Sequence, residues 1–202
     1  MTRAEFAARL KNACAAVTAA EAELTEIDSK FGDADHGLTM AKIAGAISEA
    51  VDAAEGGIQS MLDDAARAVM TLNGGSAVPL WNTWLDGLQE EAPEGEEIDV
   101  AGLKAIFAKA LEELEDMSGA KVGDKTMMDA LIPASEAVAA YTGDSADELF
   151  DAAAQAAAQG AEATKQYVSK FGRAKSYGTK TIGTPDAGAV SMSWFFQGLA
   201  RE

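Results

Sequence analysis

The 202-residue chain contains a single cysteine, Cys14, and a single histidine, His36. One cysteine cannot form an internal disulfide, and the two residues together do not supply the ligand spacing of a zinc site. No apolar run approaches the ~18–20 residues that a membrane-spanning helix needs. The opening stretch MTRAEFAARL lacks the apolar segment of a secretory signal peptide. We therefore expect a cytoplasmic protein without a membrane partner.

Basic residues are also scarce: 16 lysines and arginines face 33 aspartates and glutamates, which gives a formal net charge of −17. A nucleic-acid-binding protein normally presents a basic face, so this composition argues against nucleic acid as a partner. The acidic run from Glu90 to Asp99 is typical of a solvated loop. If so acidic a protein binds an anion such as a nucleotide, cations should lie between the two.

Strand-like alternation is missing as well, whereas apolar residues recur at helical spacing along most of the chain. The pattern Thr2-x-x-Glu5 predicts a capping box at the first helix, and Asp99 and Ser145 have the positions of later N-caps, Ser145 with a second capping box. We predict an all-α fold of one domain over residues 1–202. Its first helix runs from Thr2 to about residue 28, and the other seven cover approximately 38–55, 57–72, 79–90, 99–117, 125–141, 146–170 and 187–201.

Helices joined by short connections fold most simply as an up-and-down antiparallel array. In such an array the loops after the first, third, fifth and seventh helices lie at one end. These loops are the glycine-rich ones, namely FGDADHG, NGGSAV, SGAKVGDK and FGRAKSYGTKTIGTPDAG. The loops EGG, EEAPEGEEID and TGDS fall at the other end. Because function often lies on loops held by a rigid scaffold, the pattern predicts one site built from four loops.

Three aspartates, Asp28, Asp33 and Asp35, surround the end of the first predicted helix. Converging carboxylates suit hard cations such as Mg²⁺ or Ca²⁺. An EF-hand is excluded, because a loop that began at Asp33 would have Leu38 at the glycine position and Ala44 at the glutamate position. Mg²⁺ would neutralise both the aspartates and a polyphosphate. The alternative is that Asp28 ends a helix and the other two shape a turn.

His36 precedes Gly37 where a helix is expected to begin, a place that favours anions, so contact with a phosphate oxygen is one interpretation and simple packing is the other. In the next glycine-rich loop, Gly74, Gly75 and Ser76 precede the start of a helix. Glycines there let backbone N–H groups face a phosphate, although the same residues also suit an ordinary turn.

The segment from Gly119 to Thr126 is not a P-loop, because its spacing differs and no strand precedes it. Within it, Asp124 is expected to cap the following helix. Met127 and Met128 then either pack in the core or contact an adenine face.

The segment from Gly172 to Gly188 is long enough for a lid or a binding loop. It offers four charged side chains to the same end of the molecule: Arg173, Lys175, Lys180 and Asp186. The planar guanidinium of Arg173 is suited to clamp a phosphate, whereas basic residues in loops are usually only solvated.

In this order, the motifs GDADHG, NGGSAVPLW, GDKTMMDAL, GRAKSYG and GTPDAGAVS resemble the nucleotide-binding L subunit of dihydroxyacetone kinase, the DhaL family. The resemblance covers nearly the whole chain. It implies a closed barrel of eight antiparallel helices, with ADP or ATP bound by the loops at one end through two Mg²⁺ ions. The metal ligands that it implies are Asp28, Asp33 and Asp35. The implied nucleotide contacts are His36, Gly37, Leu38, Thr39, Gly75, Ser76, Ala77, Gly119, Met127, Arg173, Asp186, Ala187 and Gly188.

The chain departs from the DhaL pattern at several positions. Ala34 replaces the second glycine of GDGDHG, and Ala77-Val78 replaces a hydroxyl residue and a glycine beside the phosphates. Ala187 stands at the proline of DPG, and Lys180 replaces an arginine. The three aspartates and Arg173 are retained.

The resemblance further implies a kinase subunit that transfers a phosphoryl group to a primary hydroxyl of a ketose, with His36 and Arg173 as catalytic residues. The ketose, dihydroxyacetone or a larger one such as erythrulose, would sit on a separate K-type subunit. The nucleotide would either exchange as ATP or stay bound as ADP and be rephosphorylated by a phosphotransferase-system phosphocarrier. The alternative is an ADP-loaded sensor that binds a transcription regulator. A homodimer is left open.

Overall fold

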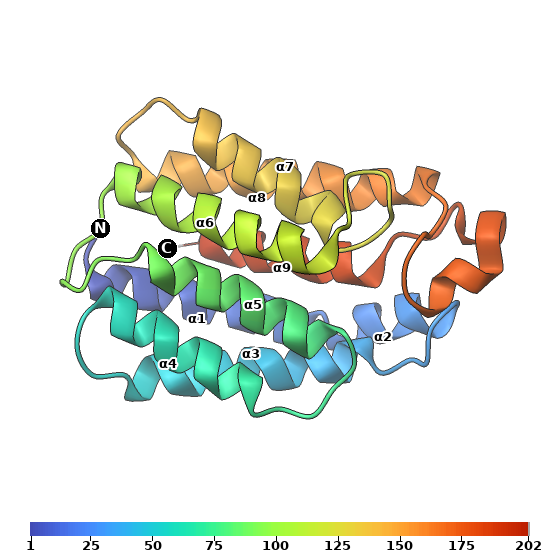
Figure 1. The fold of residues 1–202 in the computed structure, drawn as a ribbon, viewed down its shortest axis with the longest axis horizontal. Coiled ribbons are helices and arrows are strands. Elements are labelled where there is room, and N and C mark those ends of the chain that lie inside the picture. The colour runs from blue at the N-terminus through green and yellow to red at the C-terminus, as the bar shows by residue number, and fades with distance from the viewer. Residues whose placement is uncertain (202) are drawn as a thin grey trace.

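The computed structural model describes residues 1–201, and its regular structure there is helical apart from one isolated bridge between Thr2 and Glu97 (Figure 1). Glu202, the last residue of the predicted domain, lies outside the described residues. Two short 3-10 helices, η1 (Thr164–Gln166) and η2 (Arg173–Thr181), precede the last α-helix. The α-helices are α1 (Arg3–Ala19), α2 (Glu21–Ser29), α3 (His36–Ala53), α4 (Ile58–Met70), α5 (Ala77–Glu90), α6 (Val100–Ser118), α7 (Met128–Ala140), α8 (Ala146–Ala163) and α9 (Ala187–Leu199).

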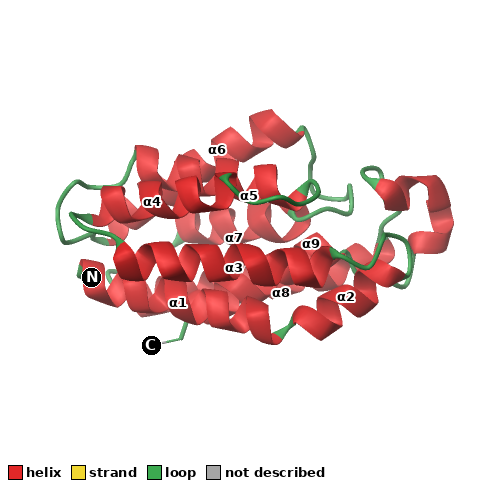
Figure 2. Cartoon of the chain, turned by 90° about the horizontal axis from the view of Figure 1, so that it is seen from below, coloured by secondary structure: helices red, strands yellow, loops and turns green. Residues whose placement is uncertain are grey.

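The helices form a closed antiparallel ring (Figures 1 and 2). From α3 to α9 each helix packs against the one before it, and α9 also packs against α1. The predicted all-α barrel is therefore confirmed. Within residues 1–201, no helix combines the length and the apolar character needed to cross a bilayer.

The predicted first helix is wrong in one respect, because it is two helices that follow one another along a single position of the ring (Figure 2). At Ala20 the backbone turns to ψ 3°, and its N–H bonds back to the carbonyls of Ala16 and Val17. Two other predicted ends also shift. The helix predicted from residue 125 begins at Met128, because Lys125 has a left-handed φ of 62°. The helix predicted to end at 170 ends at Ala163.

The predicted N-caps explain where several helices begin. Thr2 and Glu5 form the full capping box, with bonds of 3.3 Å from Glu5 N to Thr2 Oγ1 and 2.7 Å from Thr2 N to Glu5 Oε2. Asp99 accepts a bond from Gly102 N at 2.8 Å. The second predicted box is only half formed, because Ser145 caps α8 while the Glu148 carboxylate accepts the hydroxyl of Tyr141 instead.

Aromatic side chains from α5 and α9 fill the centre of the ring. Trp81 and Trp84 each lie edge-on to Phe195, with ring centroids 5.1 and 5.4 Å apart. Phe196 and Phe107 extend this cluster toward α6, and all five side chains are at most 1% exposed. Edge-to-face pairs add to the large area that such residues bury. The cluster therefore ties the last helix to the middle of the chain.

Gly198 closes the ring where α9 crosses α1. A Cβ at Gly198 would lie 2.3 Å from Ala13 Cα, so only glycine lets the two backbones approach this closely. The start of α1 and the end of α9 lie at this side of the molecule, while α2 and η2 mark the opposite end (Figure 1).

We predict that Gly198→Ala lowers the free energy of unfolding by about 1–3 kcal/mol, the usual range for overpacking, because backbone atoms of α1 must move. Urea unfolding followed by circular dichroism measures this change. The matched control is Gly45→Ala in α3, where a Cβ meets no described atom within 4 Å and alanine should stabilise the helix by about 0.5–1 kcal/mol. Equal stability of Gly198→Ala and the parent would show that the crossing is not tight.

Candidate functional site

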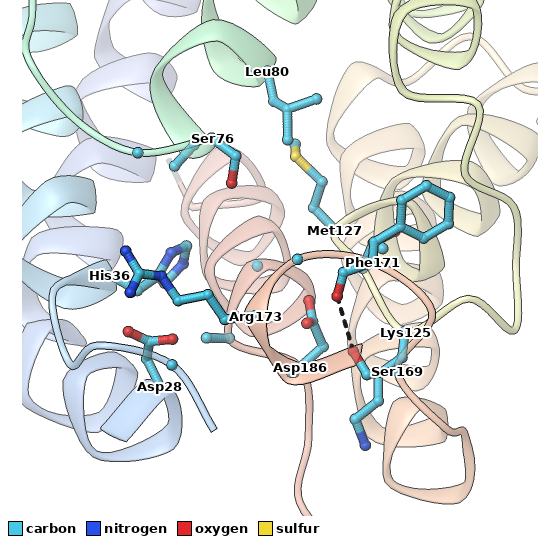
Figure 3. A pocket seen from close by; sticks show the side chains of 18 of the residues that line it. Asp28, His36, Ser76, Leu80, Lys125, Met127, Ser169, Phe171, Arg173 and Asp186 are labelled. Carbon is cyan, nitrogen blue, oxygen red and sulfur yellow. Dashed lines mark hydrogen bonds between the residues drawn. The ribbon is translucent and has the colours of Figure 1, made fainter. Parts of the chain in front are cut away.

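A cavity of about 510 Å³ opens at the end of the ring that α2 and η2 mark (Figure 3). Its walls come from the connections α2–α3, α4–α5, α6–α7 and α8–α9. These are the four glycine-rich loops, so the prediction that they share one end of the fold is confirmed.

Three carboxylates gather on one wall of this cavity. Asp28, Asp33 and Asp35 each offer an oxygen, and these oxygens lie within 4.8 Å of one another. Asp28 also accepts a bond from the backbone N–H of Asp35 at 3.2 Å, so it fixes the loop as well as facing the cavity. The grouping has the donor type and the spacing that a hard divalent cation requires.

Ala34 lies between two of these aspartates with a left-handed φ of 61°. An L-residue with a Cβ is strained in this conformation, whereas glycine is not. The glycine expected here by resemblance to DhaL therefore has a backbone reason, and alanine keeps the turn at a cost in stability.

Three helices begin at the cavity, with Asp35, Ser76 and Met127 as the N-caps of α3, α5 and α7. Among the described residues, none of these three side chains caps its own helix, although the Thr126 hydroxyl accepts a bond from Met128 N at the start of α7 at 3.2 Å. First-turn N–H groups without a side-chain cap are available to an anion, and the helix dipole favours negative charge there.

His36 links this wall to the last helix. Its Nε2 lies 3.2 Å from Ser191 Oγ, and the Ser191 hydroxyl donates to the carbonyl of Gly188 at 2.9 Å. Burial lowers the pKa of His36 below its ordinary value, and the carboxylates of Asp28 and Asp35 oppose that shift. The imidazole is thus oriented at the cavity wall and not free to rotate.

Arg173 approaches the carboxylates from the segment between α8 and α9. Its guanidinium pairs with Asp33 at 2.7 Å, yet the side chain remains 72% exposed. Figure 3 shows this side chain extending across the cavity toward Asp28 and His36. An exposed arginine in this position can turn to a bound phosphate without breaking packing.

The far side of the cavity is apolar. Leu80, Ala120, Met127 and Phe171 line it, and Figure 3 places Leu80, Met127 and Phe171 away from Asp28 and His36. Such a wall suits the flat face of a base. Sequence reasoning missed Leu80 and Phe171. Phe171 could have been noticed as an aromatic residue directly before Gly172 in the long loop.

Asp186 caps α9 by accepting a bond from Ala189 N at 2.8 Å. Burial raises the pKa of Asp186 to about 7, the nearby Asp129 carboxylate adds to this, and Lys125 opposes it. Asp129 is itself 1% exposed, accepts bonds from Gly123 N and Thr126 N, and has a pKa raised by burial. Neither role was expected from the sequence.

The structure brings most of the predicted site residues to the cavity. Those that line it are Asp28, Asp33, Asp35, His36, Thr39, Gly75, Ser76, Ala77, Met127, Arg173, Asp186, Ala187 and Gly188.

Three predicted contacts lie outside this lining. Gly37 packs against α2, where a Cβ would lie 2.1 Å from the carbonyl oxygen of Glu21. Leu38 is half exposed, and Gly119 ends α6 with a φ of 63°. Lys175 and Lys180 do not line the cavity either.

The expectation that Asp124 caps α7 is wrong. Its carboxylate instead accepts a bond from Lys121 N at 2.8 Å and pairs with Lys170 at 2.6 Å. These partners engage the carboxylate, and the helix itself starts later, with Met127 as its N-cap.

Residues 30–201 match the family described as the DAK2 domain. The chain belongs to the DAK2 domain family. The resemblance to DhaL is confirmed by relatives of similar length. The ADP-binding subunit DhaL of the PEP-dependent dihydroxyacetone kinase of Escherichia coli is 28% identical, and the alignment covers 93% of this chain and 91% of that protein. The ADP-binding subunit DhaL of the PEP-dependent dihydroxyacetone kinase 1 of Listeria innocua is 29% identical, and the alignment covers 88% of this chain and 85% of that protein.

Longer relatives contain this domain as one part. L-erythrulose kinase of Pectobacterium atrosepticum is 36% identical over 96% of this chain, which spans about a third (34%) of that protein. The structure of the dihydroxyacetone kinase of C. freundii in complex with AMP-PNP and Mg²⁺ superposes with a TM-score of 0.73 at 24% identity, over 98% of this chain and 33% of that one. The latter match shows that this DAK2 domain shares the same fold.

We predict that Ala34→Gly raises the free energy of unfolding by about 0.5–1 kcal/mol, because removal of the Cβ relieves the left-handed strain by more than glycine adds in chain entropy. Urea unfolding of the ligand-free protein measures the gain. Ala105→Gly, on the exposed face of α6, should instead lose up to about 1 kcal/mol. A loss of stability in both variants would contradict the strain at Ala34.

The raised pKa of Asp186 predicts a pH dependence of stability. The folded state keeps this proton up to about pH 7, whereas the unfolded carboxyl releases it near 3.8, so the contribution of Asp186 to stability falls as pH rises between these values. Asp186→Asn keeps a capping side chain and should flatten the decline. Urea unfolding at several pH values, without ligand, measures it. Asp99→Asn at the cap of α6 is the control, and superimposable profiles for Asp186→Asn and the parent would refute the assignment.

Proposed function

We propose that this DAK2 domain binds ADP or ATP together with Mg²⁺ in the cavity and passes a phosphoryl group to a ketose hydroxyl. The observation that carries the proposal is the meeting of opposite charges: three carboxylates on one wall lie at the same cavity as an exposed arginine and the N-termini of α3 and α5, which have no side-chain cap. A divalent cation held by these carboxylates would supply the positive charge that phosphates require beside them. The volume, about 510 Å³, lies in the range of small-ligand sites.

The residues present fit Mg²⁺, because all three candidate ligands are carboxylates and their oxygens lie within 4.8 Å of one another. Asp28, Asp33 and Asp35 would hold two such ions. When bound, Mg²⁺ supplies charge neutralisation for the phosphates and for the phosphoryl group in transit.

The rest of the chain contributes position and charge. The amides at the starts of α3 and α5 would hold phosphate oxygens, with Ser76 adding a hydroxyl. Val78 replaces a small residue of the DhaL pattern, but it is 7% exposed and faces Gly74, so the cavity wall at Ser76 and Ala77 stays open. His36 and Arg173 would contact the transferred phosphoryl group, where fixed donors stabilise developing charge.

The ketose and its carrier belong to the proposal as well. We propose that a K-type subunit presents a primary hydroxyl of dihydroxyacetone or erythrulose at the cavity mouth, in keeping with relatives named for either substrate. The hydroxyl oxygen forms the new P–O bond as the bond to the nucleotide breaks. The names of the E. coli and Listeria relatives as PEP-dependent support a phosphocarrier partner. A cytoplasmic location and a single functional domain over 1–202 complete the proposal.

Native mass spectrometry with and without EDTA tests the site directly. We expect a mass increment for one ADP and two Mg²⁺ ions, which EDTA removes. Asp33→Asn should weaken Mg·ADP binding by at least about 10–100-fold, the range observed when only a supporting partner of a metal ligand is lost. Asp116→Asn, an exposed aspartate on α6, should bind like the parent.

Phosphoryl transfer is tested by mixing the protein with a K-type subunit, a ketose and ATP. Turnover with this mixture supports the kinase. No complex with Mg²⁺ and either nucleotide, in a protein that retains its helical circular dichroism, would refute the proposed site.

A further inference from the structure

Lys125, in the loop between α6 and α7, is buried although lysine rarely is, with only 4% of the residue exposed. Its Nζ donates to four backbone carbonyls: Thr164 O at 2.8 Å, Tyr167 O at 3.2 Å, Thr181 O at 2.7 Å and Thr184 O at 2.6 Å. An ammonium has three N–H donors, so the four oxygens share them. Carbonyl oxygens surround a bound monovalent cation in the same way.

All four carbonyls belong to the segment 164–184 between α8 and α9. Two of them precede Phe171 and Arg173, and two follow. The segment is therefore bound to the ammonium both before and after the part of the loop that places Phe171 and Arg173 at the cavity. Lys125 itself borders the cavity, but its Nζ is occupied by these bonds.

Water cannot easily replace the ammonium in this cage. Thr164 and Thr181 are fully buried, and their side chains bind the same segment. Thr164 Oγ1 accepts a bond from Asp186 N at 2.9 Å, and Thr181 Oγ1 accepts one from Ser169 N at 3.1 Å. Without a cation, several buried carbonyl oxygens would face one another with no partner for their second lone pairs.

The loop that carries Lys125 is held in a strained conformation. Lys125 has a left-handed φ of 62°. A residue with a side chain keeps this conformation only when the surrounding structure enforces it. Asp129 accepts bonds from Gly123 N and Thr126 N, on either side of Lys125. Burial lowers the pKa of Lys125, while the carboxylates of Asp186 and Asp129 favour its charged form.

We propose that Lys125 is a positioning residue whose ammonium takes the place of a structural monovalent cation and holds the segment 164–184 so that Arg173 and Phe171 face the cavity. The inference rests on the proposed function in one respect, because the effect of positioning is measured as nucleotide affinity. Lys125 does not act on the reacting atoms.

Two variants of the full chain test this role. Lys125→Gly removes the side chain and also accepts the left-handed φ without strain, so it empties the cage and leaves the loop relaxed. Lys125→Met keeps the stem and removes the charge. Lys165→Met is the matched control, because Lys165 lies in the same segment and, among the described residues, its Nζ pairs with the exposed Glu162 alone.

The first measurement is the dissociation constant for Mg·ADP by calorimetry, in choline chloride and in ammonium or potassium chloride at equal ionic strength. Both Lys125 variants should bind about tenfold or more weakly in choline chloride, because small displacements of positioning groups have effects of this size. Ammonium or potassium should restore affinity in Lys125→Gly, whose cage is vacant, but not in Lys125→Met. Neither cation should change the affinity of the parent or of Lys165→Met.

The second measurement is limited trypsin digestion without nucleotide, which keeps this test separate from the proposed function. Lys170, Arg173, Lys175 and Lys180 are exposed cleavage sites in the segment. They should be cut faster in both Lys125 variants, and ammonium should slow the cutting of Lys125→Gly alone. If the parent bound no Mg·ADP, the proposed function would fail while this result still supported the cage.

Several results would overturn the inference. One is unchanged affinity and unchanged cleavage in both variants. Another is weakened binding that no monovalent cation restores in Lys125→Gly. Loss of helical circular dichroism in both variants would also overturn it, because Lys125 would then support the whole fold and not the segment.

Discussion

Three carboxylates held within 4.8 Å of one another repel, and the chain around them carries a net charge of −17. Several groups at that end of the ring offset this repulsion. Arg173 forms an ion pair with Asp33. Three helices direct the positive ends of their dipoles at the cavity. The buried ammonium of Lys125 also favours the charged form of Asp186. The negative charge of the carboxylates is neutralised only in part, which supports the proposal that a divalent cation binds there.

The antiparallel topology makes this concentration of charge possible. Helices that run up and down return the chain to the same end after every second helix, so residues as distant as Asp28, Ser76 and Arg173 meet without long crossings. Within residues 1–201, the cavity at the opposite end is smaller, about 300 Å³, and is lined by Asp99, Val100, Ala101, Lys104 and Asp144. One aromatic cluster between α5 and α9 keeps the ring from opening and thereby fixes the separation of the four loops.

Much of this followed from the sequence because it depended on local rules. Helical periodicity and the caps at Thr2 and Asp99 are local, and parity alone placed the glycine-rich loops together. The features that were missed depend on tertiary contacts. The break at Ala20 has no glycine or proline to announce it. Lys125 was predicted to begin a helix, and nothing in GDKTMM indicates that four carbonyls from a distant segment enclose its ammonium. Leu80 and Phe171 line the cavity only because α5 and the last loop converge there, which is a tertiary contact.

The start of α1 and the end of α9 lie at the end of the ring away from the cavity (Figure 1). A tether attached to either one leaves the mouth unobstructed and directed outward. A surface-immobilised or fused copy would therefore present its mouth to whatever approaches from solution. The same geometry means that a neighbouring domain on a short linker cannot cover the mouth by folding back over the nearer loops; it would have to reach along the full length of the helices.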